Sequence, residues 1–134
     1  MAHIDNTLQN NIVLRPGDNA TFHCITTNTS VLYWIHDYIR EGAIGDRIEL
    51  YFIPNDDSNT SQEISRGYAT ARLTGYSVDN ETGLITLESQ INITVPAFET
   101  DSPLVCSTVD GSNDSIQILN HVSRKFSMEQ ISAV

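Results

Sequence analysis

The sequence predicts an all-β fold, an antiparallel β-sandwich or β-barrel formed by a single domain. Aliphatic, aromatic and Cys residues make up 40% of the 134 residues, which is enough to fill the core of one domain. Short runs that alternate apolar and polar side chains follow one another, turn residues separate them, and no stretch has a helical period. Such runs are typical of strands that bury one face.

Eight runs are predicted to form strands. In chain order they cover residues 11–14, 19–26, 31–37, 48–53, 68–73, 84–95, 104–108 and 115–122. Pro16 and Gly17 supply the backbone angles of a tight turn between the first two strands. In the second strand, Phe22 and Cys24 share a face because alternate side chains point the same way. Residues 55–65 are mostly polar and are predicted to be a loop or an irregular edge strand.

The predicted domain spans residues 11–126. Residues 1–10 are expected to be a tail that includes an added start, and residues 127–134 a tail or linker. The first residues lack the basic and apolar regions of a signal peptide. No run approaches the ~20 apolar residues that a membrane-spanning helix needs. We therefore expect a fragment of a longer protein.

The chain is strongly acidic. Its 7 Lys and Arg residues against 17 Asp and Glu residues give a net charge of −10. A surface of that charge repels phosphate groups, and no basic stripe offsets it. Nucleic acids and anionic membranes are therefore not expected as partners.

Asn-x-Ser/Thr triplets (sequons), the acceptors of N-linked glycans, are frequent. The 11 Asn and 26 Ser and Thr residues would give about two by chance, whereas the chain has six. The sequons begin at Asn19, Asn28, Asn59, Asn80, Asn92 and Asn113. Their excess predicts N-linked glycans and an extracellular or cell-surface location. The alternative is that an Asn- and Thr-rich β-protein contains them through composition alone.

Two Cys residues and the single Trp carry a family resemblance. Trp34 follows Cys24 by ten residues, and Cys106 lies 82 positions beyond Cys24. Residues 15–24 read Arg-Pro-Gly-Asp-Asn-Ala-Thr-Phe-His-Cys. With these motifs, residues 14–122 resemble the immunoglobulin superfamily, most closely a variable-type domain. The resemblance implies an immunoglobulin-like two-sheet antiparallel β-sandwich with Greek-key connections, V-set-like in having extra edge strands.

The resemblance also implies the arrangement of the core. Cys24 and Cys106 would form a disulfide between the sheets, and Trp34 would pack against it. The shared face of Cys24 and Phe22 agrees with an inward-pointing Cys side chain. The alternative is a pair of free, buried thiols.

No catalytic site, metal site or cofactor is expected. The four His residues, at positions 3, 23, 36 and 121, lack the spacing of metal ligands. His36 shares a strand face with Trp34 and is predicted to be hydrogen-bonded in or near the core. Acidic residues cluster in turns without the ordered spacing of a calcium loop. Nucleophile-elbow, phosphate-loop and Cys-x-x-Cys motifs are absent, so we do not expect an enzyme.

The predicted glycan positions indicate which surface contacts a partner. Glycans at Asn19 and Asn92 would cover the outer face of one sheet. The other sequons are predicted in loops at one end of the sandwich (Asn28, Asn80 and Asn113) or near an edge (Asn59). The outer face of the other sheet would stay bare, and the side chains predicted to project from it are Tyr33, Ile35, Tyr51 and Ile53.

Exposed aromatic and aliphatic side chains in one patch are typical of protein recognition. We therefore expect an extracellular recognition module whose bare face binds a protein, either an identical domain or a distinct ligand. The preferred interpretation is an adhesion or receptor domain of a membrane-anchored glycoprotein. A secreted immune-type binder and a structural spacer in a multi-domain ectodomain are the alternatives. The two tyrosines could also be ordinary surface residues, or residues 55–65 could cover them.

Overall fold

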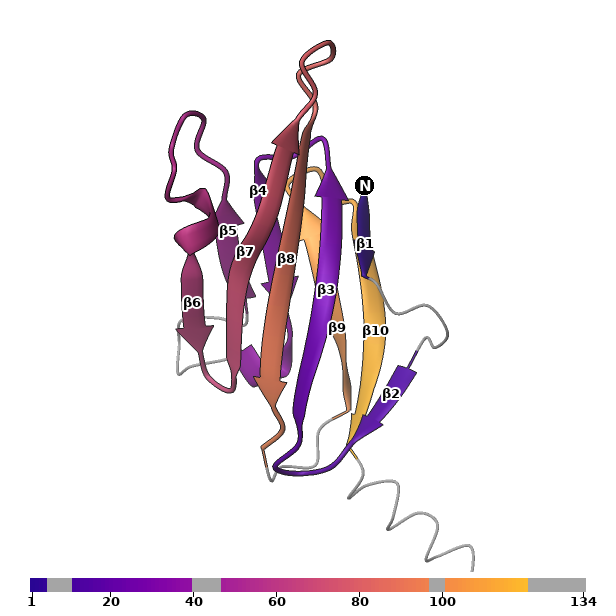
Figure 1. The fold of residues 1–134 in the computed structure, drawn as a ribbon. Coiled ribbons are helices and arrows are strands. Elements are labelled where there is room, and N and C mark those ends of the chain that lie inside the picture. Colours follow the sequence, from indigo (N-terminus) through magenta and orange to yellow (C-terminus); the bar gives the residue numbers. More distant parts are fainter. Residues whose placement is uncertain (5–10, 40–46, 97–100, 121–134) are drawn as a thin grey trace, which may run out of the picture.

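Two five-stranded sheets pack face to face (Figure 1). The structure is a computed structural model that describes residues 1–4, 11–39, 47–96 and 101–120. In order of neighbouring strands, the first sheet consists of β1 (Ala2–Ile4), β3 (Asn19–Thr27), β8 (Ile85–Thr94), β7 (Ala69–Val78) and β6 (Glu63–Arg66). The second sheet consists of β2 (Asn11–Leu14), β10 (Asn113–Asn120), β9 (Ser102–Thr108), β4 (Val31–Ile35) and β5 (Arg47–Tyr51). The fold is an all-β, two-sheet sandwich, as the sequence predicts.

Strand direction and alternation explain how these residues form the sandwich. Neighbouring strands run antiparallel, except that β2 and β10 run parallel. In β3, Phe22, Cys24 and Thr26 are buried while the residues between them are exposed. In β4, Leu32 and Trp34 are buried in the same way. The buried side chains of both sheets fill the space between them.

The structure differs from the sequence prediction at the start of the chain. Residues 2–4, expected in a tail, form β1 and pair with β3. Ala2 and Ile4 are buried in the core. The main-chain N–H of Ile4 also donates a 2.8 Å hydrogen bond to Asp114 Oδ2 on β10. This bond ties β1 to the second sheet.

Several other strand boundaries shift, and the predicted strand end at 122, domain end at 126 and tail at 127–134 lie outside the described residues. The strand predicted at 31–37 ends at Ile35, and a short 3-10 helix, η1 (Asp37–Ile39), follows it. The strand predicted at 68–73 continues to Val78, because residues 75–78, beyond a bulge at Leu73/Gly75, still pair with β8. Within residues 55–65, a second 3-10 helix, η2 (Asn59–Ser61), precedes edge strand β6.

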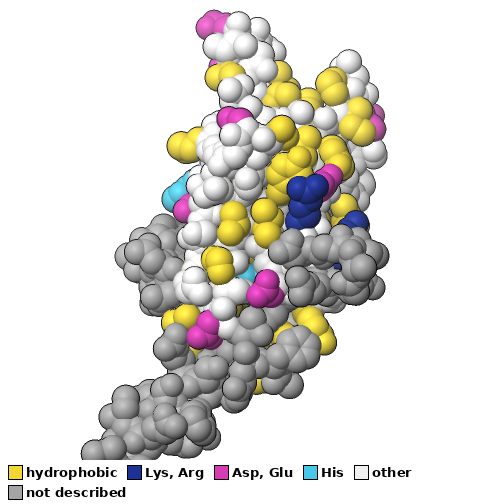
Figure 2. Space-filling view, turned by 180° about the vertical axis from the view of Figure 1, so that it is seen from behind, with side chains coloured by type: hydrophobic (Ala, Val, Ile, Leu, Met, Phe, Trp, Pro, Cys, Tyr) yellow, Lys and Arg dark blue, Asp and Glu magenta, His cyan; other side chains and the backbone are white. Residues whose placement is uncertain are grey.

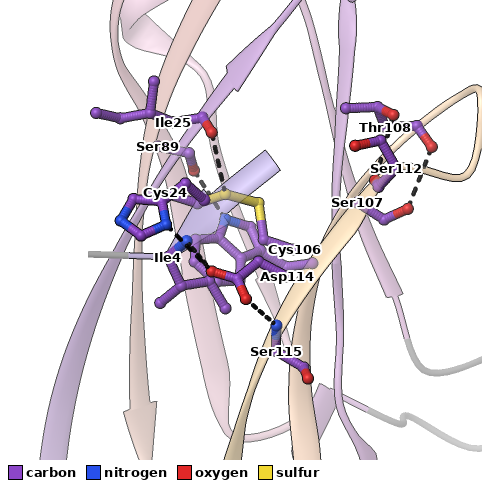
Figure 3. Close-up of a disulfide and its surroundings, with 12 residues drawn as sticks. Ile4, Cys24, Ile25, Ser89, Cys106, Ser107, Thr108, Ser112, Asp114 and Ser115 are labelled. Atoms are coloured by element: carbon purple, nitrogen blue, oxygen red, sulfur yellow. Dashed lines mark hydrogen bonds and ion pairs between the residues drawn. A yellow bond between two sulfur atoms is a disulfide. The ribbon is translucent and has the colours of Figure 1, made fainter. Parts of the chain in front are cut away.

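A disulfide, drawn in Figure 3, and the single Trp link the two sheets at one level of the core. Cys24 on β3 and Cys106 on β9 are bonded, with their Cα atoms 6.5 Å apart, which confirms the expected pairing. Trp34 is fully buried, and its Nε1 donates a 2.8 Å hydrogen bond to Ser89 Oγ on β8. Trp34 lies opposite Cys106 in its ladder, and Ser89 lies opposite Cys24. The covalent link and the hydrogen-bonded link are therefore neighbours.

His36 has the structural role that its strand parity predicts. It is 2% exposed, and its Nε2 lies 2.8 Å from Ser102 Oγ on β9. Ser102 is also buried, at 8% exposure. The pair therefore satisfies polar groups within the core.

Candidate functional site

The outer face of β4 and β5 brings together Tyr33, Ile35 and Tyr51, three of the four apolar side chains expected there, and Ile53 follows two residues after the end of β5. The β4–β5 face, as we name it, comprises Tyr33, Ile35, Arg47, Glu49, Tyr51 and Ile53. Tyr51 and Ile53 are 45% and 52% exposed, while Tyr33 and Ile35 are half-buried. Figure 2, which looks onto the second sheet, shows hydrophobic side chains gathered next to basic and acidic ones. The face therefore combines apolar area with charge.

A charged pair connects the two tyrosines of this face. Arg47 Nη2 lies 2.9 Å from Glu49 Oε1, and the Arg47 guanidinium carbon lies 5.1 Å from the centroid of the Tyr33 ring. The Tyr51 hydroxyl donates a hydrogen bond to Glu49 Oε2. This bond raises the pKa of Tyr51 above its usual value, because ionisation would remove the proton that the hydroxyl donates to Glu49. Tyr33, Arg47, Glu49 and Tyr51 thus form one connected row.

A groove adjoins the β4–β5 face, between the edge strands of the two sheets. It has a volume of about 370 Å³ and lies between edge strands β5 and β6. Arg47, Glu49 and Tyr51 line one wall, and Ile64 and Arg66 line the other.

Two sequons lie side by side on the outer face of the first sheet. Asn19 lies opposite Thr94, and Thr21 lies opposite Asn92, in the β3–β8 ladder. Thr94 Oγ1 donates to Asn19 Oδ1 at 2.7 Å, and Thr21 Oγ1 donates to Asn92 Oδ1 at 2.6 Å. Each Asn thus accepts a hydrogen bond from the Thr of the other sequon. These bonds use the amide oxygens and leave Nδ2, the atom that carries a glycan, on the exposed face.

Asn59 differs from the other sequons because its side chain is buried, at 2% exposure. Its Oδ1 accepts a 2.9 Å hydrogen bond from the Ile53 N–H. Its Nδ2 donates to the main-chain oxygens of Ile53 and Asp56, at 2.8 and 2.9 Å. Both Nδ2 hydrogens are therefore engaged, and a glycan on this nitrogen would require the turn to open. The expected glycan near an edge does not fit the fold at Asn59.

The remaining sequons are at one end of the sandwich, but Asn113 is also close to the β4–β5 face. The Asn28 N–H donates to the Ile85 main-chain oxygen at 2.8 Å, next to the turn that contains Asn80. Asn113, expected in a loop, is the exposed first residue of β10. It lies opposite Ser107, which lies opposite Tyr33. Two strand spacings of about 5 Å each separate it from Tyr33.

A glycan at Asn113 would therefore stand on the β10 side of the face. β5 itself contains no sequon, and Asn59, the sequon whose amide is bonded to Ile53, is buried. A partner would therefore approach more easily from the β5 side.

A scan against models of known protein families finds no match, and a search of curated proteins finds no related chain. In the described ranges, no helix is long and apolar enough to cross a membrane. The same ranges contain no group of three or more His, Cys, Asp and Glu side chains placed to hold a metal ion. The arrangement of the residues themselves is therefore the basis for inferring a function.

Proposed function

We propose that this chain is an extracellular, immunoglobulin-type recognition domain that binds another protein through its β4–β5 face. The observation that carries the proposal is the row of Tyr33, Arg47, Glu49 and Tyr51, which is exposed at one margin of the second sheet. Tyr and Arg are the side chains enriched at binding hot spots, because they combine apolar area with directed polar groups. The proposal describes a binding domain rather than an enzyme.

The core supports membership of the immunoglobulin superfamily. A disulfide joins β3 to β9 across the sheets, and the buried Trp34 on β4 lies next to it. This is the arrangement of the second, third and sixth strands of an immunoglobulin domain. Strand β5 continues the sheet beyond β4, as an additional strand does in a variable-type domain. Strand β6 departs from that type, because it pairs with β7 in the first sheet.

The distribution of sequons supports the outer face of the second sheet as the binding surface. N-linked glycans at Asn19 and Asn92 would cover the outer face of the first sheet. We therefore propose a glycoprotein on the cell surface or outside the cell, since sequons and disulfides both belong to that compartment. The parent chain is proposed to be membrane-anchored. A structural spacer is a weaker proposal, because it gives no role to an exposed row of tyrosines.

Removing both tyrosines of the row is expected to weaken partner binding. The glycosylated domain, displayed as a multimer, would be tested against an array of extracellular proteins that includes the domain itself. Tyr33→Ala with Tyr51→Ala should weaken binding by about tenfold or more, because the variant loses two aromatic contacts of the face.

Tyr68→Ala is the matched control for this test. Tyr68 is 43% exposed, close to the 45% of Tyr51, but it precedes β7 in the first sheet. The control should bind like the wild type. Unchanged binding by the double variant, together with weaker binding by Tyr68→Ala, would show that the partner uses another surface.

A further inference from the structure

β5 has one edge without a neighbouring strand, and the direction of its main-chain N–H and C=O groups can be assigned residue by residue. β5 is the outermost strand of the second sheet. The Phe52 N–H donates to the Ser30 main-chain oxygen at 2.8 Å, so the main chain of residue 52 is directed toward the β4 side. Main-chain groups alternate in direction along a strand. Arg47, Glu49 and Tyr51 therefore direct their N–H and C=O groups away from β4.

Two side-chain amides cover one half of this edge. Gln62 Oε1 accepts a 2.9 Å hydrogen bond from the Tyr51 N–H, and Gln62 Nε2 donates to the Tyr51 main-chain oxygen. Asn59 makes the same two bonds to Ile53, at 2.9 and 2.8 Å. At residues 51 and 53 a side-chain amide thus takes the place of a neighbouring strand, which protects the edge from further pairing.

The other half of the edge is open. In the part of the chain that the structure describes, no hydrogen bond from outside the β4–β5 ladder reaches the main chain of Arg47 or Glu49. The groove of about 370 Å³ separates these residues from Ile64 and Arg66 of β6. Among the described residues, the outward N–H and C=O groups of Arg47 and Glu49 therefore have no partner, and both residues line the groove.

We propose that this open edge pairs with the same edge of a second copy of the chain. An antiparallel pairing with its two-fold axis at Ile48 places Arg47 of each copy opposite Glu49 of the other. This register uses the outward main chain of both residues and forms about four main-chain hydrogen bonds. The proposal goes beyond the function proposed above, because it adds the main-chain edge of β5, which the proposed recognition surface does not use, to the side chains of Arg47 and Glu49.

Charge selects this register over its neighbours. Shifting the register by two residues keeps the outward main-chain groups paired. Such a shift would place Glu49 opposite Glu49, or Arg47 opposite Arg47. Opposite charges across a strand pair stabilise it, whereas like charges destabilise it. In the proposed register, two Arg and two Glu side chains alternate on one face, where they are 57% and 29% exposed.

The position of the edge also permits this contact. Asn59 is the sequon nearest to it, and its buried amide leaves no place for a glycan. Each copy has a net charge of −10, but at physiological salt charges are screened over about 8 Å. The charges in direct contact therefore decide the pairing. Because two residues per strand form a small interface, we expect a weak dimer that many copies on facing surfaces would strengthen.

Sedimentation equilibrium of the whole chain, at physiological salt and up to millimolar concentration, tests the proposal. The average mass of the wild type should rise toward twice the monomer mass. Arg47→Glu alone and Glu49→Arg alone place like charges opposite each other, and each variant should stay monomeric. An equimolar mixture of the two variants should form heterodimers, since Arg then lies opposite Glu in both cross-strand pairs. Arg72→Glu, at an exposed position of the first sheet, should dimerise like the wild type.

A monomeric wild type at the highest concentration would overturn the proposal. So would single variants that dimerise like the wild type, or a mixture that stays monomeric. The pairing of the mixture shows that both variants are folded. Failure here leaves the proposed function standing, because loss of binding with Tyr33→Ala and Tyr51→Ala is measured separately.

Discussion

Replacing both Cys24 and Cys106 by Ala is expected to lower the free energy of unfolding by about 4 to 5 kcal/mol. The disulfide joins residues 82 positions apart, so it restricts a large part of the unfolded chain. It also connects the two sheets at the centre of the core, where both Cys side chains are fully buried. Since domains of this size are commonly stable by only 5–15 kcal/mol, as an order of magnitude, the variant should be close to unfolding at body temperature.

Urea denaturation followed by circular dichroism measures this loss. Addition of a reductant should shift the wild-type midpoint toward that of the double variant. The double variant provides the control, because its own midpoint should not move with reductant. A loss of less than about 1 kcal/mol would mean that the disulfide contributes little to the sandwich.

Trp34→Ala is expected to cost about 3 to 5 kcal/mol of unfolding free energy. The side chain is fully buried in the second sheet, and its removal leaves a cavity beside the disulfide. It also removes the hydrogen bond from Nε1 to Ser89 Oγ, which links the second sheet to the first. Circular dichroism is the suitable probe, because Trp34 is the only Trp of the chain.

The hydrogen bond can be separated from the packing by a double-mutant cycle. Ser89→Ala leaves the buried indole N–H without a partner and should cost about 1 to 3 kcal/mol. In a Trp34→Phe background, which has no indole N–H, the same substitution should cost less. Val109→Ala, at a 63% exposed position, is the control and should change stability very little. Equal costs of Ser89→Ala in both backgrounds would contradict a role for this bond.

The strands could be predicted where apolar and polar side chains alternate over several residues. The other strands depend on tertiary contacts. In residues 19–26, the alternation that includes Phe22 and Cys24 is long enough to define a strand and its inner face. β1 is three residues long, which is too short to show a period. Its position depends on pairing with β3 and on a bond to Asp114, 110 positions away.

The candidate site was predictable only in part for the same reason. The outward direction of the Tyr33 and Tyr51 side chains could be predicted, because each alternates with buried neighbours along its strand. The sequence does not reveal that Arg47 lies over Tyr33, because that contact depends on the register of β4 against β5. The sequon at Asn59 reads like any other, although its amide is bonded to the main chain. Strand β10 begins two residues before the predicted 115, which moves Asn113 from a turn onto a sheet.

The measurement that tests the central claim most directly is partner binding by two variants that each carry one added glycan. Glu49→Asn with Tyr51→Thr creates a sequon on the β4–β5 face, and Arg72→Asn creates one with Thr74 on the outer face of the first sheet. Arg72 and Thr74 are exposed, so a glycan at position 72 can be accommodated. We predict that the glycan on the β4–β5 face abolishes binding and that the glycan on the first sheet leaves it unchanged. Binding that survives the first glycan and is lost with the second would contradict the claim that the β4–β5 face is the recognition surface.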